Sequence, residues 1–591
     1  MKKLVKLGLV LVLSFSLFAC ASNNQSTTQG VKDGVYEATA QGNNGPVKVA
    51  VTLKNEAIEK VEVLEHTETA GLSDNAIKNI PVAIVENQSI SVDTVSGATV
   101  SSNAIIAAVT TALESAGVDI AKFKKEVSKT ELKIEDLSTE VIIIGSGGAG
   151  LSAAIEAREA GAEVVVIEKM PFAGGNTLLS YAELACANNW LQEEKGIKDS
   201  KEQFAKEMWE GGGKVARKEM VDTVVDGALD GALWLRDTIG VKYQDYLVHE
   251  GGHTVARAVE PIELGPGMIN PMVDYANKIG VKILYNVKAE ELIVEYGKVV
   301  GVSVSSGDST AKFTASKGVV LATGGFGANV DMRVKYNKRW KTLDESVKTT
   351  NSPGATGEGI LMAEKIGAQL EGMEYIQLYP FNNPITGVFY GIEAPSWSGE
   401  GIVYVNMDGK RFVNETGMRD ERAEGILAQN GKVFAIYNQE VADRLNMEEK
   451  FAGEYEQCLK DGVFFKADTL EEIAKHFGIN EKNLVETMKK YNEYMEAGKD
   501  PEFNRKTSMV TMKEGPWFIL EGVVSVHHTM GGVMIDEQAR VLDASKNPIP
   551  GLYAAGEVTG SIHGNNRVGT FAISEIVVFG RIAGKNVANE K

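Results

Sequence analysis

Two short segments near the C-terminus carry side chains suited to binding an organic acid. His527 and His528 precede Thr-Met-Gly-Gly, and Arg567 follows Glu557 in a stretch rich in Gly and Asn. The planar guanidinium group of Arg donates paired hydrogen bonds to a carboxylate, and a His ring adds a further donor. These residue types therefore predict a site that holds at least one carboxylate.

A glycine-rich turn predicts the elements that must position this site. The apolar run 141–144 predicts a buried strand, residues 151–160 a helix, and 163–167 the next strand. Gly145 would make the turn, Gly147 would let a pyrophosphate approach the backbone, and Gly150 would let helix pack on strand. Glu168 would accept hydrogen bonds from ribose hydroxyls. This βαβ unit fits NAD and FAD equally.

Three later segments favour FAD over NAD. Gly175, Asn176 and Thr177, then Thr323 and Gly324, then Glu557 stand in Gly-rich stretches that follow in this order. They resemble the FAD-contacting segments of the fumarate reductase/succinate dehydrogenase flavoprotein family. The resemblance covers about residues 138–591. It implies non-covalent FAD in a Rossmann-like α/β domain.

The resemblance also implies a capping domain inserted into the FAD-binding domain. The expected α+β cap spans 374–526, and the FAD-binding domain spans 138–373 and 527–591. Arg419 ends a segment matching the one whose final Arg protonates the substrate, and Arg567 with His527 matches the pair that holds one carboxylate of fumarate. A positioned guanidinium group can also stabilise negative charge in the transition state. The alternative for Arg419 is a structural salt bridge with Asp420.

The second carboxylate site of the family is altered in this sequence. Tyr379 stands in place of a cationic His, and Glu183 in place of a small Gly. Glu393 can replace the family's relay Glu if two residues are inserted after it, but the segment 392–399 contains no Arg. Like charges would repel a second carboxylate here. We therefore expect a monocarboxylate with a neutral or cationic distal group.

Three substrate types fit that expectation, namely urocanate, acrylate and cinnamate-type acids. Tyr379 in the His position resembles urocanate reductases, where acidic residues suit the imidazole. His528 is expected near the substrate. The alternatives are a fumarate reductase, a ketosteroid-type flavin dehydrogenase, and an electron-carrier lipoprotein without a substrate of its own.

Residues 31–117 resemble a covalent FMN-binding domain. Val47, Val49 and Val51 alternate with other residues as in a half-buried strand, residues 58–64 predict its hairpin partner, and 101–116 predict a helix. The motif that ends at Thr99 resembles the site that a flavin transferase modifies, so Thr99 would carry FMN. The alternative is an ordinary N-cap sequence. This small α+β domain would pass electrons from a membrane or extracellular donor to FAD.

The N-terminus predicts export. Lysines precede an apolar run that ends at Ala19, and Cys20 follows in a bacterial lipobox-like sequence. Residues 1–19 would be a lipoprotein signal peptide, Cys20 the lipidated residue, 20–30 a tether and 118–137 a charged linker. The alternative is a plain signal peptide or a short anchor helix. We expect an enzyme of anaerobic respiration, anchored by lipid to the extracytoplasmic face of the membrane.

Composition narrows the possible partners and cofactors. The net charge of −19 argues against nucleic acid as a partner. Only Cys186 and Cys458 follow Cys20, which leaves no ligand set for an iron–sulfur cluster and no disulfide framework. We expect no metal site. The redox chemistry is therefore expected to depend on organic cofactors.

Overall fold

The computed structural model describes residues 33–590, except 43–44, 69–72, 93, 96–98, 126–132 and 397–398. The expected signal peptide, the tether and Cys20 lie outside these residues. The Thr99 side chain is also outside the description, although the backbone of Thr99 begins a helix. Within the described part of the chain, no helix is long and apolar enough to cross a membrane.

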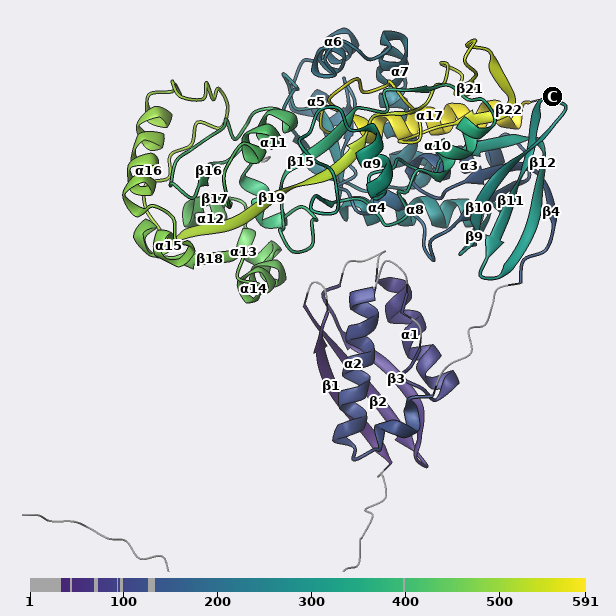
Figure 1. Cartoon of the computed structure of the whole chain (residues 1–591), viewed down its shortest axis with the longest axis horizontal. Coiled ribbons are helices and arrows are strands. Elements are labelled where there is room, and N and C mark those ends of the chain that lie inside the picture. Colours follow the sequence, from purple (N-terminus) through teal and green to yellow (C-terminus); the bar gives the residue numbers. More distant parts are fainter. Residues whose placement is uncertain are drawn as a thin grey trace, which may run out of the picture.

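The small N-terminal domain packs two helices on a three-stranded antiparallel sheet of order β1-β2-β3 (Figure 1). Its elements are β1 (Gly34–Gln41), β2 (Pro46–Lys54), β3 (Ala57–Glu65), α1 (Asp74–Asn87) and α2 (Thr99–Ser115). Val47, Val49 and Val51 are fully buried in a core that is separate from the core of the rest of the chain. The predicted strand, hairpin partner and helix are confirmed.

The expected boundary between this domain and a linker at residue 118 is wrong. A 3-10 turn, η1 (Ile120–Phe123), follows α2, and Phe123 is buried in the core of the small domain. The Phe123 carbonyl also accepts a hydrogen bond from the amide of Ile90, at 2.7 Å. An apolar ring within the Lys- and Glu-rich segment therefore extends the domain beyond residue 117.

The large domain is built on an eight-stranded sheet whose central strands are parallel. Its main order is β10-β11-β12-β4-β5-β9, and β22 pairs with β12 and β21. The strands are β4 (Leu137–Ile144), β5 (Val164–Glu168), β9 (Lys282–Tyr285), β10 (Lys288–Glu295), β11 (Lys298–Ser306), β12 (Ser309–Leu321), β21 (Arg540–Leu542) and β22 (Pro548–Ala554). The expected α/β class is confirmed.

Helices and smaller strands surround this sheet, and the C-terminal helix α17 (Phe571–Ala588) packs along α3 (Gly148–Glu159) (Figure 1). The other helical elements are α4 (Gly175–Leu178), α5 (Trp190–Glu194), α6 (Lys201–Gly211), α7 (Lys218–Trp234), the π-helical turn η2 (Leu235–Ile239), α8 (Leu264–Lys278), α9 (Val330–Tyr336) and α10 (Glu358–Lys365). Two short strands, β14 (Leu370–Glu371) and β20 (Gly532–Val533), pair with each other.

A separate sheet of order β6-β8-β7 borders the large domain. It consists of β6 (Leu184–Ala185), β7 (Tyr243–Val248) and β8 (Ala258–Pro261). Leu184 pairs with Val259, and Leu247 pairs with the same residue from the other side. This register brings three distant segments of the chain together.

The cap contains a six-stranded sheet around the long strand β19 (Trp517–Thr529). Its other strands are β13 (Lys348–Thr349), β15 (Ile376–Asn382), β16 (Val403–Asn406), β17 (Val433–Asn438) and β18 (Phe464–Ala467). The helical elements are η3 (Gly391–Ser396), α11 (Arg419–Leu427), α12 (Gln439–Arg444), α13 (Met447–Lys450), α14 (Ala452–Lys460), α15 (Leu470–Phe477) and α16 (Glu481–Glu496).

The structure does not divide at the expected cap limits of 374 and 526. β13 joins the cap sheet from a position before residue 374, and β19 continues past residue 526 (Figure 1). A continuous strand therefore connects the cap to the large domain. The residues at its C-terminal end lie where the two parts meet.

Candidate active site

The turn between β4 and α3 can be built only from small residues. Gly145 has φ +102°, and a Cβ on it would lie 2.4 Å from the carbonyl oxygen of Ala322. A Cβ on Gly150 would lie 1.9 Å from the carbonyl oxygen of Gly145. Gly147 has only Gly174 within 4 Å of such an atom. Gly145 and Gly150 therefore pack tightly against neighbouring backbone, whereas Gly147 borders a cavity.

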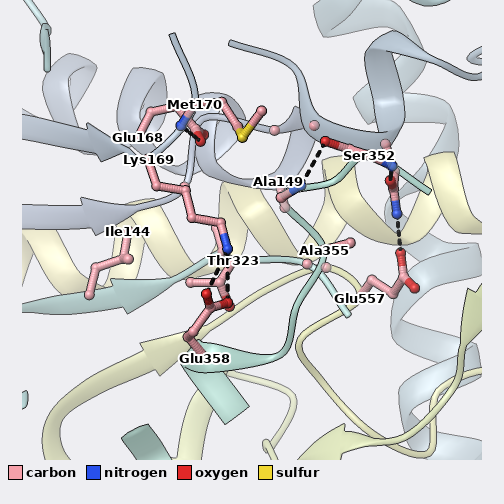
Figure 2. A pocket seen from close by; sticks show the side chains of 18 of the residues that line it. Ile144, Ala149, Glu168, Lys169, Met170, Thr323, Ser352, Ala355, Glu358 and Glu557 are labelled. Carbon is pink, nitrogen blue, oxygen red and sulfur yellow. Dashed lines mark hydrogen bonds and ion pairs between the residues drawn. The ribbon is translucent and has the colours of Figure 1, made fainter. Parts of the chain in front are cut away.

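That cavity, with an empty volume of about 900 Å³ including its mouth, contains nine of the ten predicted cofactor-binding residues in its lining. They are Gly145, Gly147, Glu168, Gly175, Asn176, Thr177, Thr323, Gly324 and Glu557. Glu168 accepts hydrogen bonds from the amides of Ser146 and Met170, at 2.9 and 2.8 Å. The next residue, Lys169, pairs with Glu358 across the cavity (Figure 2).

A second cavity, of about 840 Å³, adjoins the first, since Asn176, Thr177, Glu557 and Ile576 line both. The structure brings six of the predicted substrate residues into its lining: Glu183, Tyr379, Arg419, His527, His528 and Arg567. They come from segments up to several hundred residues apart. This second cavity is therefore the candidate substrate site.

The two arginines of this cavity have unused hydrogen-bond donors. Nη2 of Arg419 lies 2.9 Å from Oε1 of Glu250, while its buried Nε and Nη1 atoms have no partner among the described residues. Nε of Arg567 also has none. Burial, and then the charge of Arg419, lower the pKa of Arg567 to about 9. A bound anion would satisfy these donors and offset the repulsion between the two charges.

The histidines of β19 are neutral donors or acceptors rather than charges. Burial, and then the charge of Arg567, hold the pKa values of His527 and His528 well below the usual range. Nδ1 of His527 lies 2.8 Å from Oγ1 of Thr350, which orients its ring. Nε2 of His528 is buried without a partner in the described structure. Both rings therefore remain suited to hydrogen bonding with a ligand.

Aromatic rings form another wall of the cavity. The ring of Phe389 lies 5.5 Å from the rings of both Tyr181 and Tyr379, and the ring of His527 lies 5.1 Å from Tyr379. The guanidinium carbon of Arg419 lies 4.9 Å from the centre of the Tyr379 ring. Burial raises the pKa of Tyr379, so its hydroxyl is neutral. This wall offers a flat, uncharged surface beside the arginines.

The prediction that Glu393 lines the distal pocket with Tyr379 and Glu183 is not supported by the structure. Glu393 is buried in η3, accepts a hydrogen bond from the hydroxyl of Tyr404, and is absent from the lining of the cavity. Burial raises its pKa to about 7, although the nearby Arg422 opposes the shift. The short 3-10 segment η3 directs the side chain towards Tyr404 in the cap.

Four residues near the site that the argument uses were missed by the sequence reasoning, namely Tyr181, Glu250, Phe389 and Arg422. Arg422 lies one helical turn after Arg419 on α11, so its helical spacing could have indicated it. Glu250 and Phe389 lie outside the motifs and gave no signal. The alternative of an Arg419–Asp420 salt bridge is also wrong, because Arg419 pairs with Glu250 while Asp420 pairs with Arg339, each at 2.9 Å.

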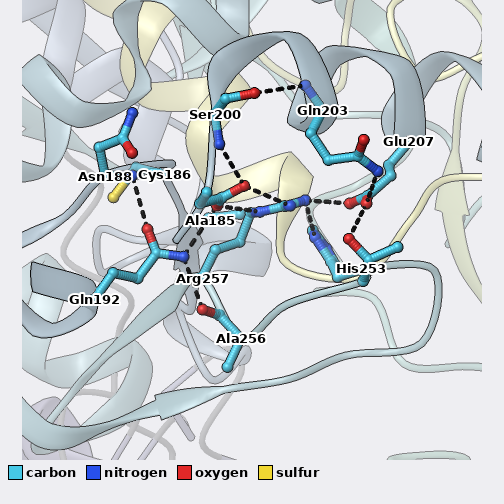
Figure 3. A network of polar contacts seen from close by, with 12 residues as sticks. Ala185, Cys186, Asn188, Gln192, Ser200, Gln203, Glu207, His253, Ala256 and Arg257 are labelled. Atoms are coloured by element: carbon cyan, nitrogen blue, oxygen red, sulfur yellow. Dashed lines mark hydrogen bonds and ion pairs between the residues drawn. The ribbon is translucent and has the colours of Figure 1, made fainter. Parts of the chain in front are cut away.

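A buried polar network supports the turn that carries Arg567. Figure 3 shows the part of this network around Arg257 and His253. Arg257 donates to Asp199 at 2.9 and 3.0 Å and to Nδ1 of His253 at 2.9 Å. Nε2 of His253 lies 3.0 Å from the carbonyl oxygen of Gly569. Because guanidinium only donates and a carbonyl only accepts, Nδ1 must be bare and Nε2 must carry the proton. Burial lowers the pKa of His253 to about 4, which agrees with this neutral form.

Two family models match this chain, one over its large domain and one over its N-terminal domain. Residues 140–573 match a family model described as an FAD binding domain, and residues 42–114 match one described as an FMN-binding domain. A urocanate reductase of Eggerthella lenta is 37% identical over 97% of this chain and 96% of its own length. A fumarate reductase (cytochrome) of Shewanella frigidimarina is 37% identical over 80% of each chain. The chain belongs to the fumarate reductase/succinate dehydrogenase flavoprotein family.

A solved member of this family has the same architecture. The open conformation of a flavocytochrome c3 fumarate reductase aligns with a TM-score of 0.66 at 33% identity, over 80% of this chain and 84% of that one. The chain is thus an FAD-binding oxidoreductase of a family whose relatives act on C=C bonds, and it carries an FMN-binding domain. Among the described residues, no cluster of His, Cys, Asp and Glu could hold a metal ion.

The first cavity fits FAD on steric and polar grounds. Gly147 leaves the backbone open for a pyrophosphate, and the helix N-terminus of α3 faces it. Oγ1 of Thr323 lines the cavity and is buried without a hydrogen-bond partner in the described structure. Because the two cavities share Asn176 and Glu557, a dinucleotide bound in the first would reach the substrate site in the second.

Proposed function

We propose that this protein reduces the C=C bond of an α,β-unsaturated monocarboxylate whose distal group is flat and neutral or cationic. One observation carries the proposal: Arg419 and Arg567, whose N–H groups include some without a partner among the described residues, line the same cavity as the aromatic wall of Tyr379, Phe389 and Tyr181. The N–H groups suit one carboxylate, and the rings suit a planar remainder. Urocanate and cinnamate-type acids have this shape, and acrylate is their minimal form.

In the proposed mechanism, Arg567 and His527 hold the substrate carboxylate. Their hydrogen bonds stabilise the negative charge that develops on it as the β-carbon is reduced. Arg419 gives a proton from its guanidinium group to the α-carbon. FAD, when bound and reduced, supplies the hydride for the β-carbon. The aromatic wall excludes water and orients the double bond.

A second carboxylate would be poorly accommodated. Glu183 and Glu250 line the cavity, and Tyr379 offers a neutral hydroxyl rather than a positive charge. A dicarboxylate such as fumarate would therefore place its second charge near the Glu250 anion and beside Glu183, whose pKa burial raises well above its usual value and which supplies no positive charge. The whole-chain likeness to a urocanate reductase gives further support to a monocarboxylate with a heteroaromatic group.

The decisive experiment is anaerobic reoxidation of the reduced flavin. The holoenzyme is reduced chemically and mixed with urocanate, cinnamate, acrylate or fumarate, while flavin absorbance is followed. We expect the aryl monocarboxylates to reoxidise the flavin fastest and fumarate slowly. Fumarate with a kcat/KM above every monocarboxylate would favour the alternative of a fumarate reductase. No reoxidation by any enoate would favour an electron carrier.

The setting of the reaction is part of the same proposal. We propose that Cys20 is lipidated, that the enzyme lies on the extracytoplasmic face of the membrane, and that a flavin transferase attaches FMN to Thr99. Electrons from a membrane or extracellular donor would pass through this FMN. The match of residues 42–114 to an FMN-binding domain supports such a route. Labelling with a fatty-acid precursor would test Cys20, since Cys20→Ala should remove the label.

A further inference from the structure

Among the described residues, the carboxylate that hydrogen-bonds the proton donor of the proposed reaction is Glu250 and not Glu393. Arg419 reaches Glu250 at 2.9 Å, and both side chains are about nine-tenths buried. Although burial opposes the effect, the charges of Arg419 and Arg422 keep the pKa of Glu250 below its usual value. The two groups therefore rest as an ion pair at the cavity wall.

A guanidinium group that has given up a proton must regain one before the next turnover. Neutral guanidine is a very strong base, so it takes a proton from any adjacent carboxylic acid. Glu250 is the group in position to deliver it. The question is then how a proton reaches Glu250 from solvent.

The β6-β8-β7 sheet supplies a row of proton-carrying groups. Because Leu184 pairs with Val259, Glu183 stands opposite Glu260 on the neighbouring strand. Because Leu247 also pairs with Val259, Tyr246 stands opposite Glu260 on the other side. Such cross-strand neighbours point to the same face of a sheet. The row runs from Tyr246 through Glu260 to Glu183.

Contacts along this row agree with the strand register. The hydroxyl of Tyr246 donates to Oε1 of Glu260, and Tyr246 is 43% exposed. Glu260 and Glu183 are hydrogen-bonded through their side chains. Two carboxyl groups can share a hydrogen bond only if one of them carries a proton. The pair therefore stores a proton between the surface and the cavity.

The last step of the route, from Glu183 to Glu250, crosses the cavity. Glu183 and Glu250 both line it, so water that enters after product release can bridge the two carboxyl groups. By contrast, Glu393 lies outside the lining, and no hydrogen bond of the described structure joins it to Arg419. The geometry thus distinguishes two routes to the proton donor.

We infer that solvent protons recharge Arg419 through Tyr246, Glu260, Glu183 and Glu250. This inference rests on the proposed function. In each cycle Arg419 loses a proton to the α-carbon and becomes neutral guanidine. Protonated Glu250 restores that proton, the Glu183–Glu260 pair reprotonates Glu250, and solvent reprotonates the pair along Tyr246. One solvent proton is consumed for each double bond reduced, together with the hydride that reduced FAD supplies.

In Glu250→Gln, we expect the first turnover to keep its rate and later turnovers to become slow. The Gln oxygen still accepts from Nη2 of Arg419, but the amide cannot relay a proton. Arg419 starts charged, so single-turnover reoxidation of the reduced flavin should stay within about threefold of wild type. Steady-state kcat with reduced methyl viologen should fall at least about tenfold, because each further cycle must wait for a proton. Small carboxylic acids added to the buffer should restore part of that loss.

Two further variants separate relay from structure. Glu260→Gln lies farther from Arg419 and should show the same burst followed by slow turnover. Glu393→Gln makes the same chemical change at the carboxylate of the alternative route to Arg419, and it should show no burst. Infrared difference spectra between the holoenzyme and Glu260→Gln, both without substrate and at neutral pH, should show a shifted carboxylic-acid band, because the proton shared by Glu183 and Glu260 then meets an amide instead of a carboxylate. This band is independent of turnover.

Each remaining outcome overturns the inference. Equal slowing of the first and later turnovers in Glu250→Gln would make Glu250 a structural partner. Burst behaviour in Glu393→Gln alone would place the route through Glu393, and wild-type turnover in Glu250→Gln would leave no relay role. If wild-type enzyme is not reoxidised by any enoate, the proposed function fails instead. Bound FAD, measured by absorbance, confirms that each variant is folded.

Discussion

Gln377 of β15 donates from Nε2 to the backbone carbonyl of Arg567, 2.8 Å away. The same nitrogen lies 2.9 Å from Oδ1 of Asn566, and Gln377 is buried. A cap strand therefore supports the turn that carries the proposed carboxylate-binding Arg. The position of Arg567 depends on docking between the cap and the FAD-binding domain.

Gln377→Leu should weaken substrate binding more than it slows turnover. The change removes both hydrogen bonds, each contributing about 0.5–1.5 kcal/mol, so their full loss from substrate binding would raise KM about five- to 150-fold. Steady-state kinetics with the best enoate would measure it. Gln538→Leu, an exposed substitution far from the cavity, is the matched control. An unchanged KM with reduced kcat would contradict this role.

Arg419→Ala should retain FAD and lose most turnover. Loss of a positioned acid typically costs about 10²–10⁴-fold in rate. Arg339→Ala removes an Arg that pairs with α11 through Asp420 but does not line the cavity, so it should remain close to wild type. Activity within about tenfold of wild type in Arg419→Ala would exclude Arg419 as the proton donor.

Thr99→Ala should abolish covalent FMN and leave FAD bound. The reason is that only a side-chain hydroxyl at this position can form the expected phosphodiester. Mass spectrometry of protein made with a flavin transferase would locate the flavin, and Thr110→Ala on the same helix α2 is the control. Turnover should be lost with a physiological donor but largely retained with a small reductant that reaches FAD directly. FMN on another residue would disprove the assignment.

Glu575→Gln should stabilise the protein increasingly as pH rises. Burial raises the pKa of Glu575 to about 8, even though its Oε1 accepts from the amide of Gly556. A raised folded-state pKa gives stability that is complete below the unfolded value and lost as pH rises towards 8. The Gln oxygen preserves the hydrogen bond and cannot ionise.

Apparent Tm measured at pH 5, 7 and 9 would test this stability effect. The difference between Glu575→Gln and wild type should be small at pH 5 and largest at pH 9. Glu575→Ala should be less stable at every pH, because it leaves the Gly556 amide without its acceptor. A constant difference across the three pH values would show that Glu575 is ionised in the folded state throughout.

Features with local causes could be predicted from sequence. The turn at Gly145 and the packing at Gly150 depend on steric contacts that only glycine avoids. Val47, Val49 and Val51 are buried as their alternation predicts. The β-strand period and the glycine spacing are properties of neighbouring residues, and so they are visible before the chain folds.

Features that depend on the direction of a side chain could not be predicted from the sequence. Glu393 lies in the segment where a relay residue was expected, yet η3 directs it to Tyr404 and away from the cavity. Phe123 lies in a charged segment, yet its ring completes the core of the small domain. Motif position gave the place in the chain but not the packing of a single side chain.

The sequence by itself determined the dinucleotide turn, the α/β class and the set of Arg, His and Tyr residues suited to an unsaturated acid. Only the tertiary structure decided which carboxylate meets Arg419, because Glu250 is 169 positions away and belongs to no motif. It also placed Glu183 opposite Glu260, a contact set by strand register. Local steric and periodic constraints are written in neighbouring residues, whereas pairings between distant charges arise only when the sheets and the cap pack together.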